Sequence, residues 1–163
     1  MTDSVDDLRE IDGSISREDI KKIIPYGDPF LFVDKVIHLD KKEIEASFHI
    51  SKSLSFIPAH FVGFPVIPAA ILTEGFGQSG TILIRYNIEN HDSKEILIYR
   101  TEDARFFSPV FPDKTVCYKV GLKNLSNRAA RLEGVTYVNN KKIASFRLLM
   151  TILDRTQFHQ MVI

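Results

Sequence analysis

The stretch "AHFVGFPVIPAAILTEGFGQ", residues 59–78, is the most informative part of this chain. It is apolar enough to be buried, yet it carries one histidine, His60, and one acid, Glu74. A carboxyl group among Ile, Leu and Phe side chains loses its hydration, which is costly unless the group is paired or protonated. The stretch therefore predicts a buried element that keeps two ionisable groups for a chemical reason.

The second half of this stretch begins a long apolar segment, residues 67–84. Pro68 suits the first turn of a helix, and Asn87 and Asn90 suit its end. Because the segment is apolar nearly all round, we expect a helix enclosed by the rest of the fold. Its three glycines are unfavourable in a helix interior, so they predict the close approach of another backbone.

On both sides of this helix the apolar residues mostly recur with period two, which is typical of strands. The expected strands cover residues 29–39, 43–50, 94–101, 114–123, 128–138 and 141–153. Asn139 and Asn140 form a two-residue turn between the last pair. A short helix over residues 16–24 precedes the first strand and ends before Pro25. The pattern predicts an α+β fold, in which one antiparallel sheet of five or six strands curls around the long helix.

Length and composition indicate one globular domain. The chain has 163 residues, of which 44% are hydrophobic and 26% charged. We expect a flexible acidic tail over residues 1–14 and a single domain over residues 15–163. The 21 basic residues balance the 21 acidic ones, so the chain lacks the basic excess of a nucleic-acid binder.

The sequence also favours a cytoplasmic protein. Cys117 is the single cysteine, which excludes an internal disulfide and fits a reducing compartment. The acidic N-terminus lacks the positive start and apolar run of a signal peptide. The longest apolar segment contains Glu74 and Gln78, so we expect a buried helix there and no membrane span.

His60 and Glu74 together suit proton transfer. An apolar setting favours the protonated acid and the neutral, basic imidazole, so the pair could take one proton and give another. The N–H groups at the helix start, residues 67–70, can stabilise negative charge on an oxygen. A base, an acid and an oxyanion site are what a β-elimination next to a carbonyl requires. The plainer alternative is that His60 is a packed residue bonded to a carbonyl and that Gln78 bonds Glu74 or the backbone.

Three segments resemble the hot-dog-fold β-hydroxyacyl-acyl-carrier-protein dehydratases of the FabZ type. Residues 60–78 match the family signature H-F-P-G-x-P-V-M-P-G followed by E-x-x-x-Q. The segments "IPYGDPFLFVDKV" and "ARFFSPVFPDKTV" resemble two further family motifs, L-P-H-R-Y-P-F-L-L-V-D-R-V and A-R-F-x-x-P-V-x-P-G-D. The resemblance covers roughly residues 24–152.

The resemblance implies a function and a set of site residues. His60 would be the base and Glu74 the acid, brought together across a homodimer interface that can assemble further into a trimer of dimers. The implied substrate is a 3-hydroxyacyl thioester of acyl carrier protein, or possibly of coenzyme A, with no metal or other cofactor. The implied substrate-binding groups are the Ala69 backbone N–H, Gly63, Phe61, Phe64 and Gln78.

The chain departs from the family signature at Val62, Phe64 and Ala69, which replaces a glycine. These departures leave open a specialised lipid or polyketide-like pathway, and a non-catalytic acyl- or carrier-protein-binding module. A hot-dog thioesterase is a further alternative, although it would not need both His60 and Glu74. Carrier proteins are acidic, so basic side chains should surround the site entrance. The candidates for this role are Arg100, Arg105 and Lys114.

Overall fold

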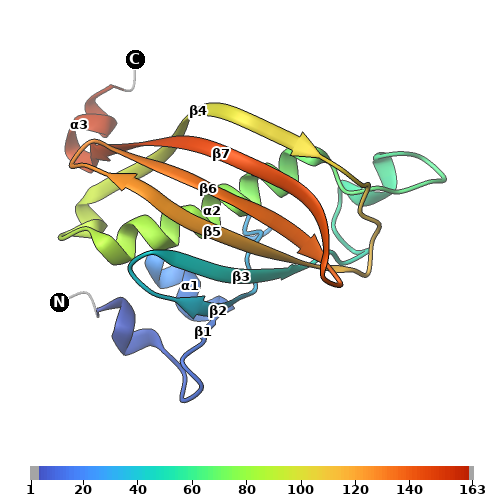
Figure 1. Cartoon of the computed structure of the whole chain (residues 1–163), viewed down its shortest axis with the longest axis horizontal. Coiled ribbons are helices and arrows are strands. Elements are labelled where there is room, and N and C mark those ends of the chain that lie inside the picture. The colour runs from blue at the N-terminus through green and yellow to red at the C-terminus, as the bar shows by residue number, and fades with distance from the viewer. Residues whose placement is uncertain (1–3, 162–163) are drawn as a thin grey trace.

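The computed structural model describes residues 4–161, in which a curved antiparallel sheet wraps around one long helix (Figure 1). The elements in chain order are η1 (Val5–Leu8), β1 (Ile15–Ser16), α1 (Arg17–Ile23), β2 (Lys35–Leu39), β3 (Glu43–His49), η2 (Ile57–Ala59), α2 (Ala69–Asn87), η3 (His91–Ser93), β4 (Lys94–Phe106), β5 (Thr115–Leu125), β6 (Ala129–Val138), β7 (Lys141–Asp154) and α3 (Arg155–Gln160). The seven strands lie in the order β1-β2-β3-β5-β6-β7-β4. The predicted α+β architecture is confirmed.

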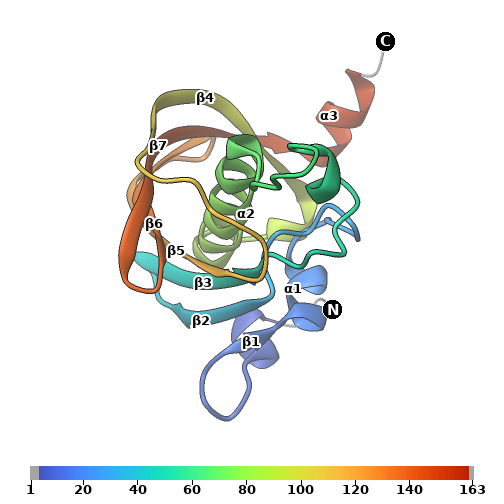
Figure 2. The same ribbon diagram turned by 90° about the vertical axis from the view of Figure 1, so that its right-hand side faces the viewer.

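Helix α2 lies in the concave side of the sheet, which surrounds much of it in the end-on view (Figure 2). It follows Pro68 and has a continuous buried run over residues 75–85. Arg85 can be buried near its end because its guanidinium donates to the carbonyls of His91 and Lys94. The prediction of an enclosed helix is therefore confirmed. Among residues 4–161, no helix has the length and apolar character needed to span a bilayer.

The glycines of α2 allow close contact between helix and sheet. A Cβ atom at Gly75 would lie 2.2 Å from the hydroxyl oxygen of Tyr118, which projects from β5. A Cβ atom at Gly80 would lie 2.1 Å from a methyl carbon of Leu132 on β6. The approach is close, but it comes mainly from side chains of the sheet and not from the expected backbone; the Phe32 carbonyl oxygen, 3.1 Å from a Cβ at Gly75, is the backbone atom among the nearest neighbours of these glycines.

The alternation predicted for the C-terminal strands is also present. On β7, the side chains of residues 144, 146, 148, 150 and 152 are all buried against the helix. Asn139 and Asn140 join β6 to β7 with φ values of 47° and 61°. Asn tolerates this left-handed region better than most residues, so the turn forms where the sequence predicts it.

Other elements differ from the expectation. The strand expected over residues 29–39 begins only at Lys35, because the backbone of residues 30–33 bonds side chains of α1 and α2 and no neighbouring strand. Strand β1 and helix α3 had no clear sequence signal. Strand β1 raises the sheet from the expected five or six strands to seven.

Residues 4–14, which belong to the segment expected as a flexible tail, contact the rest of the fold at several positions. Val5 is buried, and Arg9 donates to the carbonyls of Gly13 and Leu39. The Arg9 guanidinium also lies 5.5 Å from the ring centre of Tyr86 in α2. Residues 1–3 of the expected tail lie outside the described residues. The domain boundary at residue 15 stays a prediction.

Candidate active site

His60 lies directly after η2 and is half-buried. Its Nδ1 atom is 2.9 Å from the carbonyl oxygen of Val66, and the Val66 N–H donates to the His60 carbonyl at 2.7 Å. A carbonyl oxygen can only accept, so Nδ1 carries a proton, and in the neutral tautomer Nε2 then has the lone pair. In this tautomer Nε2 can act as a base. The bond to a carbonyl is also what the plainer reading of His60 predicts.

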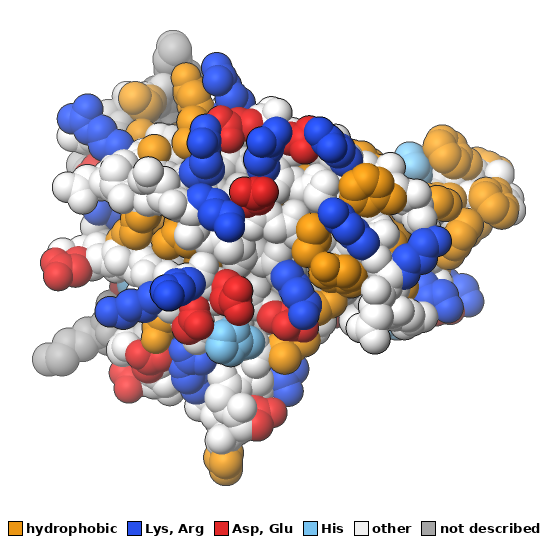
Figure 3. Space-filling view, viewed as in Figure 1, with side chains coloured by type: hydrophobic (Ala, Val, Ile, Leu, Met, Phe, Trp, Pro, Cys, Tyr) orange, Lys and Arg blue, Asp and Glu red, His pale blue; other side chains and the backbone are white. Residues whose placement is uncertain are grey.

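The loop after His60 makes a tight turn with an apolar tip. Phe61 and Phe64 exchange backbone hydrogen bonds, and Gly63 between them has φ of +77°, which favours glycine. The ring of Phe61 stacks on the His60 imidazole at 4.2 Å between centroids. The side chains of Phe61, Val62 and Phe64 are exposed, and hydrophobic side chains gather at this end of the molecule (Figure 3). Such a tip is expected to contact an apolar partner or ligand.

A cavity of about 310 Å³ lies beside His60. The residues that line it include His60, Ala69, Leu72 and residues 106–110. Ala69 is the first residue of α2, where backbone N–H groups have no partner within the helix and the helix dipole is positive. The cavity therefore combines a base with a helix N-terminus that can stabilise an anionic oxygen.

Glu74 lies elsewhere on α2. It follows Ala69 by five residues, which places it about 140° further around the helix. Within residues 4–161, no hydrogen bond or ion pair joins Glu74 to His60, and Glu74 does not line the cavity beside His60. The structure therefore keeps the two predicted catalytic residues apart within one chain.

The structure does bring Gln78 to Glu74. The Gln78 side chain is fully buried, and its Nε2 donates to Glu74 Oε1 at 3.0 Å. The same amide bonds the backbone of residues 30–32. Gln78 thus bonds Glu74, one of the two alternatives considered for it, and also a backbone segment that is distant in the sequence. Gln78 therefore contacts the Glu74 carboxyl group and does not line the cavity beside His60.

Tyr26 is a neighbour of Glu74 that the sequence analysis missed. Burial, together with the charge of Glu74 and a hydrogen bond to it, raises the pKa of Tyr26 to about 12. The phenol therefore stays protonated and can donate to the carboxylate. The signal was its position in "IPYGDPF", where the similar family motif has a histidine.

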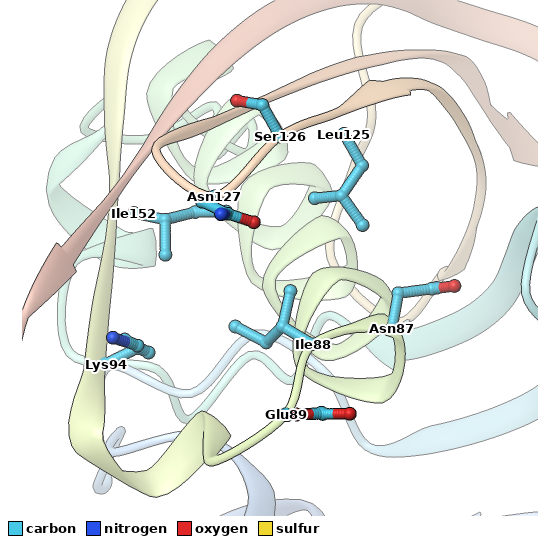
Figure 4. A pocket seen from close by; sticks show the side chains of 8 residues that line it. All are labelled: Asn87, Ile88, Glu89, Lys94, Leu125, Ser126, Asn127 and Ile152. Atoms are coloured by element: carbon cyan, nitrogen blue, oxygen red, sulfur yellow. The ribbon is translucent and has the colours of Figure 1, made fainter.

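Further surface cavities of residues 4–161 have lysines in their walls. One, of about 370 Å³, shares residues 108–110 with the His60 cavity and has Lys114 and Lys141 in its wall. Another, of about 490 Å³, lies at the C-terminal end of α2, where Ile88 and Leu125 point toward one another (Figure 4). The Lys94 ammonium in its wall already pairs with the Asp154 carboxylate at 3.7 Å. We therefore assign this lysine a structural role. Among residues 4–161, no group of three His, Cys, Asp or Glu side chains could hold a metal ion.

Comparison with known proteins identifies the family. Residues 24–147 match the model of the FabA-like domain. A 3-hydroxyacyl-[acyl-carrier-protein] dehydratase FabZ of Sulfurovum sp. is 32% identical over 143 residues, which cover 84% of this chain and 96% of the relative. The protein of the same name from Koribacter versatilis is 32% identical over 138 residues and is matched over 88% of its length.

Solved structures agree on the fold. The dehydratase heterocomplex ApeI:P of Xenorhabdus doucetiae matches with a TM-score of 0.75 at 12% identity, over 88% of this chain and 96% of the other. A thioesterase of Haemophilus influenzae matches with a TM-score of 0.61 at 15% identity, over 80% and 84% of the two chains. These matches confirm the expected hot-dog fold. The chain belongs to the FabA-like family, and the two relatives described above are dehydratases of the FabZ type.

Proposed function

We propose that this protein dehydrates 3-hydroxyacyl thioesters of acyl carrier protein to trans-2-enoyl thioesters, in fatty-acid or related lipid biosynthesis. The observation that carries the proposal is the free Nε2 of His60, held by the Nδ1 bond to Val66 in a cavity next to the N-terminus of α2. The relatives at 32% identity have this activity in their names. We also propose a cytoplasmic location, because a single cysteine fits a reducing compartment.

The proposed reaction consists of proton transfers and one C–O cleavage. Nε2 of His60 takes the proton α to the thioester carbonyl, and the electron pair of that C–H bond moves toward the carbonyl oxygen. The backbone N–H of Ala69 stabilises the negative charge on this oxygen. The electron pair then forms the C=C bond, the β C–O bond breaks, and the acid Glu74 protonates the departing hydroxyl to water. We propose no cofactor, because each step uses only groups of the protein.

We further propose that Glu74 comes from a second copy of the chain. Strand β4 is at the end of the sheet and pairs within residues 4–161 only with β7, so its other edge has free backbone groups. Leu97, Ile98 and Tyr99 on this strand are exposed, Tyr99 to 69%. A long edge strand with large apolar side chains favours pairing with another chain. A homodimer through β4 would cover these residues and supply the acid that one chain does not bring to its own His60.

Mixing two inactive variants tests the shared site. His60→Ala and Glu74→Gln should each lower turnover at least about 100-fold. If one site uses His60 of one copy and Glu74 of the other, mixed dimers contain one intact site, and co-refolding equal amounts should restore roughly a quarter of wild-type turnover. The assay is the appearance of the enoyl thioester. No recovery in a mixture that demonstrably exchanges subunits would contradict the shared site.

Basic residues near the cavities are candidates to bind the acidic carrier protein. Lys114 and Lys141 line the cavity adjoining that of His60, and the Lys142 ammonium lies 5.0 Å from the ring centre of Phe107. Of the residues expected from the sequence, Arg105 instead pairs with Asp103 at 3.2 Å, whereas Arg100 is exposed on β4. We therefore propose Lys114, with Lys141 and Lys142 at the start of β7, as the docking surface.

Charge reversal at Lys142 tests this surface. Lys142→Glu should raise KM for a carrier-protein thioester about tenfold, because rim charges steer association. The same change should leave KM for a small thiol analogue of the substrate unaltered. Lys41→Glu, in the exposed β2–β3 turn, is the matched control. Equal effects of Lys142→Glu on both substrates would argue against a carrier-protein surface here.

Product analysis separates the alternatives. A thioesterase would release a free thiol from the same substrates, and a binding module would bind them without turnover. Enoyl formation that depends on His60 supports the dehydratase. Running the assay with matched carrier-protein and coenzyme A thioesters also identifies the preferred carrier.

A further inference from the structure

Residues 28–34 form an irregular segment, here called the strap, between α1 and β2. Its outer side is held by Arg17, the first residue of α1. The Arg17 guanidinium donates to the carboxylates of Asp28 and Asp34, each at 2.5 Å. It also donates to the carbonyls of Leu31 at 3.0 Å and Val33 at 3.2 Å. One side chain thus ties both ends and the middle of the strap together.

The inner side of the strap holds Gln78. The Phe32 N–H donates to Gln78 Oε1 at 2.8 Å, and Gln78 Nε2 donates to the Phe30 carbonyl at 2.8 Å. These two bonds determine which way the buried amide faces, because its oxygen must meet an N–H group and its nitrogen a carbonyl. The second hydrogen of Nε2 is then directed to Glu74 Oε1.

We infer that Arg17 is a positioning residue for Glu74, acting through the strap and Gln78. If the strap shifts, the Gln78 amide loses the two partners that orient it, and it can rotate so that its oxygen faces the carboxylate. Glu74 would then lose the hydrogen-bond donor that holds its Oε1 atom in place. This inference rests on the proposed function, because it gives catalytic meaning to the orientation of Glu74.

Arginine suits this role better than lysine does. The four acceptors around Arg17 are spread over residues 28–34, and a planar guanidinium presents several donors in a fixed fork. An ammonium group could reach only part of this set. The strap also has its own anchor, since the side chains of residues 31–33 are buried. Loss of Arg17 should therefore loosen the strap without unfolding the protein.

Arg17→Lys tests the inference by kinetics. We expect kcat for dehydration to fall about tenfold with KM within about twofold, because a displaced catalytic group affects the chemical step more than binding. Arg9→Lys is the matched control, since the Arg9 guanidinium also bonds two backbone carbonyls but belongs to the N-terminal segment. In a Gln78→Met background, Arg17→Lys should have no further effect on kcat. The reason is that Gln78→Met already removes the amide through which Arg17 is inferred to orient Glu74. A full additional loss of kcat in that background would overturn the inference.

The side-chain amide of Gln78 provides a readout that does not need activity. Its NMR signals, assigned with Gln78→Met, should shift in Arg17→Lys and stay unchanged in Arg9→Lys. An unchanged Gln78 signal in Arg17→Lys overturns the inference even if the wild-type enzyme dehydrates its substrate. If the wild type produces no enoyl thioester, the proposed function fails, and the NMR comparison still decides whether Arg17 orients Gln78.

Discussion

Replacement of His60 by alanine should lower kcat for 3-hydroxyacyl thioester dehydration at least about 100-fold, the usual scale for loss of a general base. The reason is that the Val66 carbonyl holds Nδ1 and leaves Nε2 as the proton acceptor in the cavity. Removal of the ring takes away the base but leaves α2 and its N-terminus in place. The measurement is the rate of enoyl thioester formation by purified protein under saturating substrate.

A matched histidine separates chemistry from a general effect of the substitution. His38 is exposed on β2 and lies 3.3 Å from Asp40, so His38→Ala should leave kcat within about twofold of wild type. Circular dichroism should give both variants the same far-ultraviolet spectrum. Full activity of a folded His60→Ala protein would remove His60 as the base and favour the plainer reading of a packed histidine.

The second large effect is on stability. Gly75→Ala should lower the free energy of unfolding by about 2 kcal/mol or more, because it overpacks a well-filled core. The new Cβ would lie 2.2 Å from the Tyr118 hydroxyl oxygen and 3.1 Å from the Phe32 carbonyl oxygen, and both of these residues are fully buried. This cost exceeds the roughly 1 kcal/mol gained from replacing Gly by Ala in a helix. Urea denaturation followed by circular dichroism measures the change.

Two comparisons test the cause of this destabilisation. Gly27→Ala is the control, since a Cβ there meets no atom within 4 Å, and its effect should stay within about 0.5 kcal/mol. Tyr118→Leu shortens the side chain that Gly75→Ala would strike, so it should cost less in the Gly75→Ala background than in wild type. Strictly additive costs would mean that the contact with Tyr118 is not the source of the effect.

The features predicted from the sequence alone are the local ones. The long helix, the alternation on β7 and the Asn139–Asn140 turn were each predicted, since each depends on residues close together in the chain. The match of residues 60–78 to the family signature likewise pointed to the family and to His60, because the motif is continuous. These signals could be found without the tertiary structure.

Other features depend on contacts between distant parts of the chain. Gln78 meets the strap across 46 and 48 residues of sequence, so the expected strand became an irregular segment when its backbone bonded a helix side chain. The separation of Glu74 from His60 follows from the direction in which each side chain leaves its element, and the role inferred for Arg17 follows from the acceptors that the folded strap brings around it. Periodicity and spacing carry no information on such contacts, because only packing of the whole chain brings these groups together.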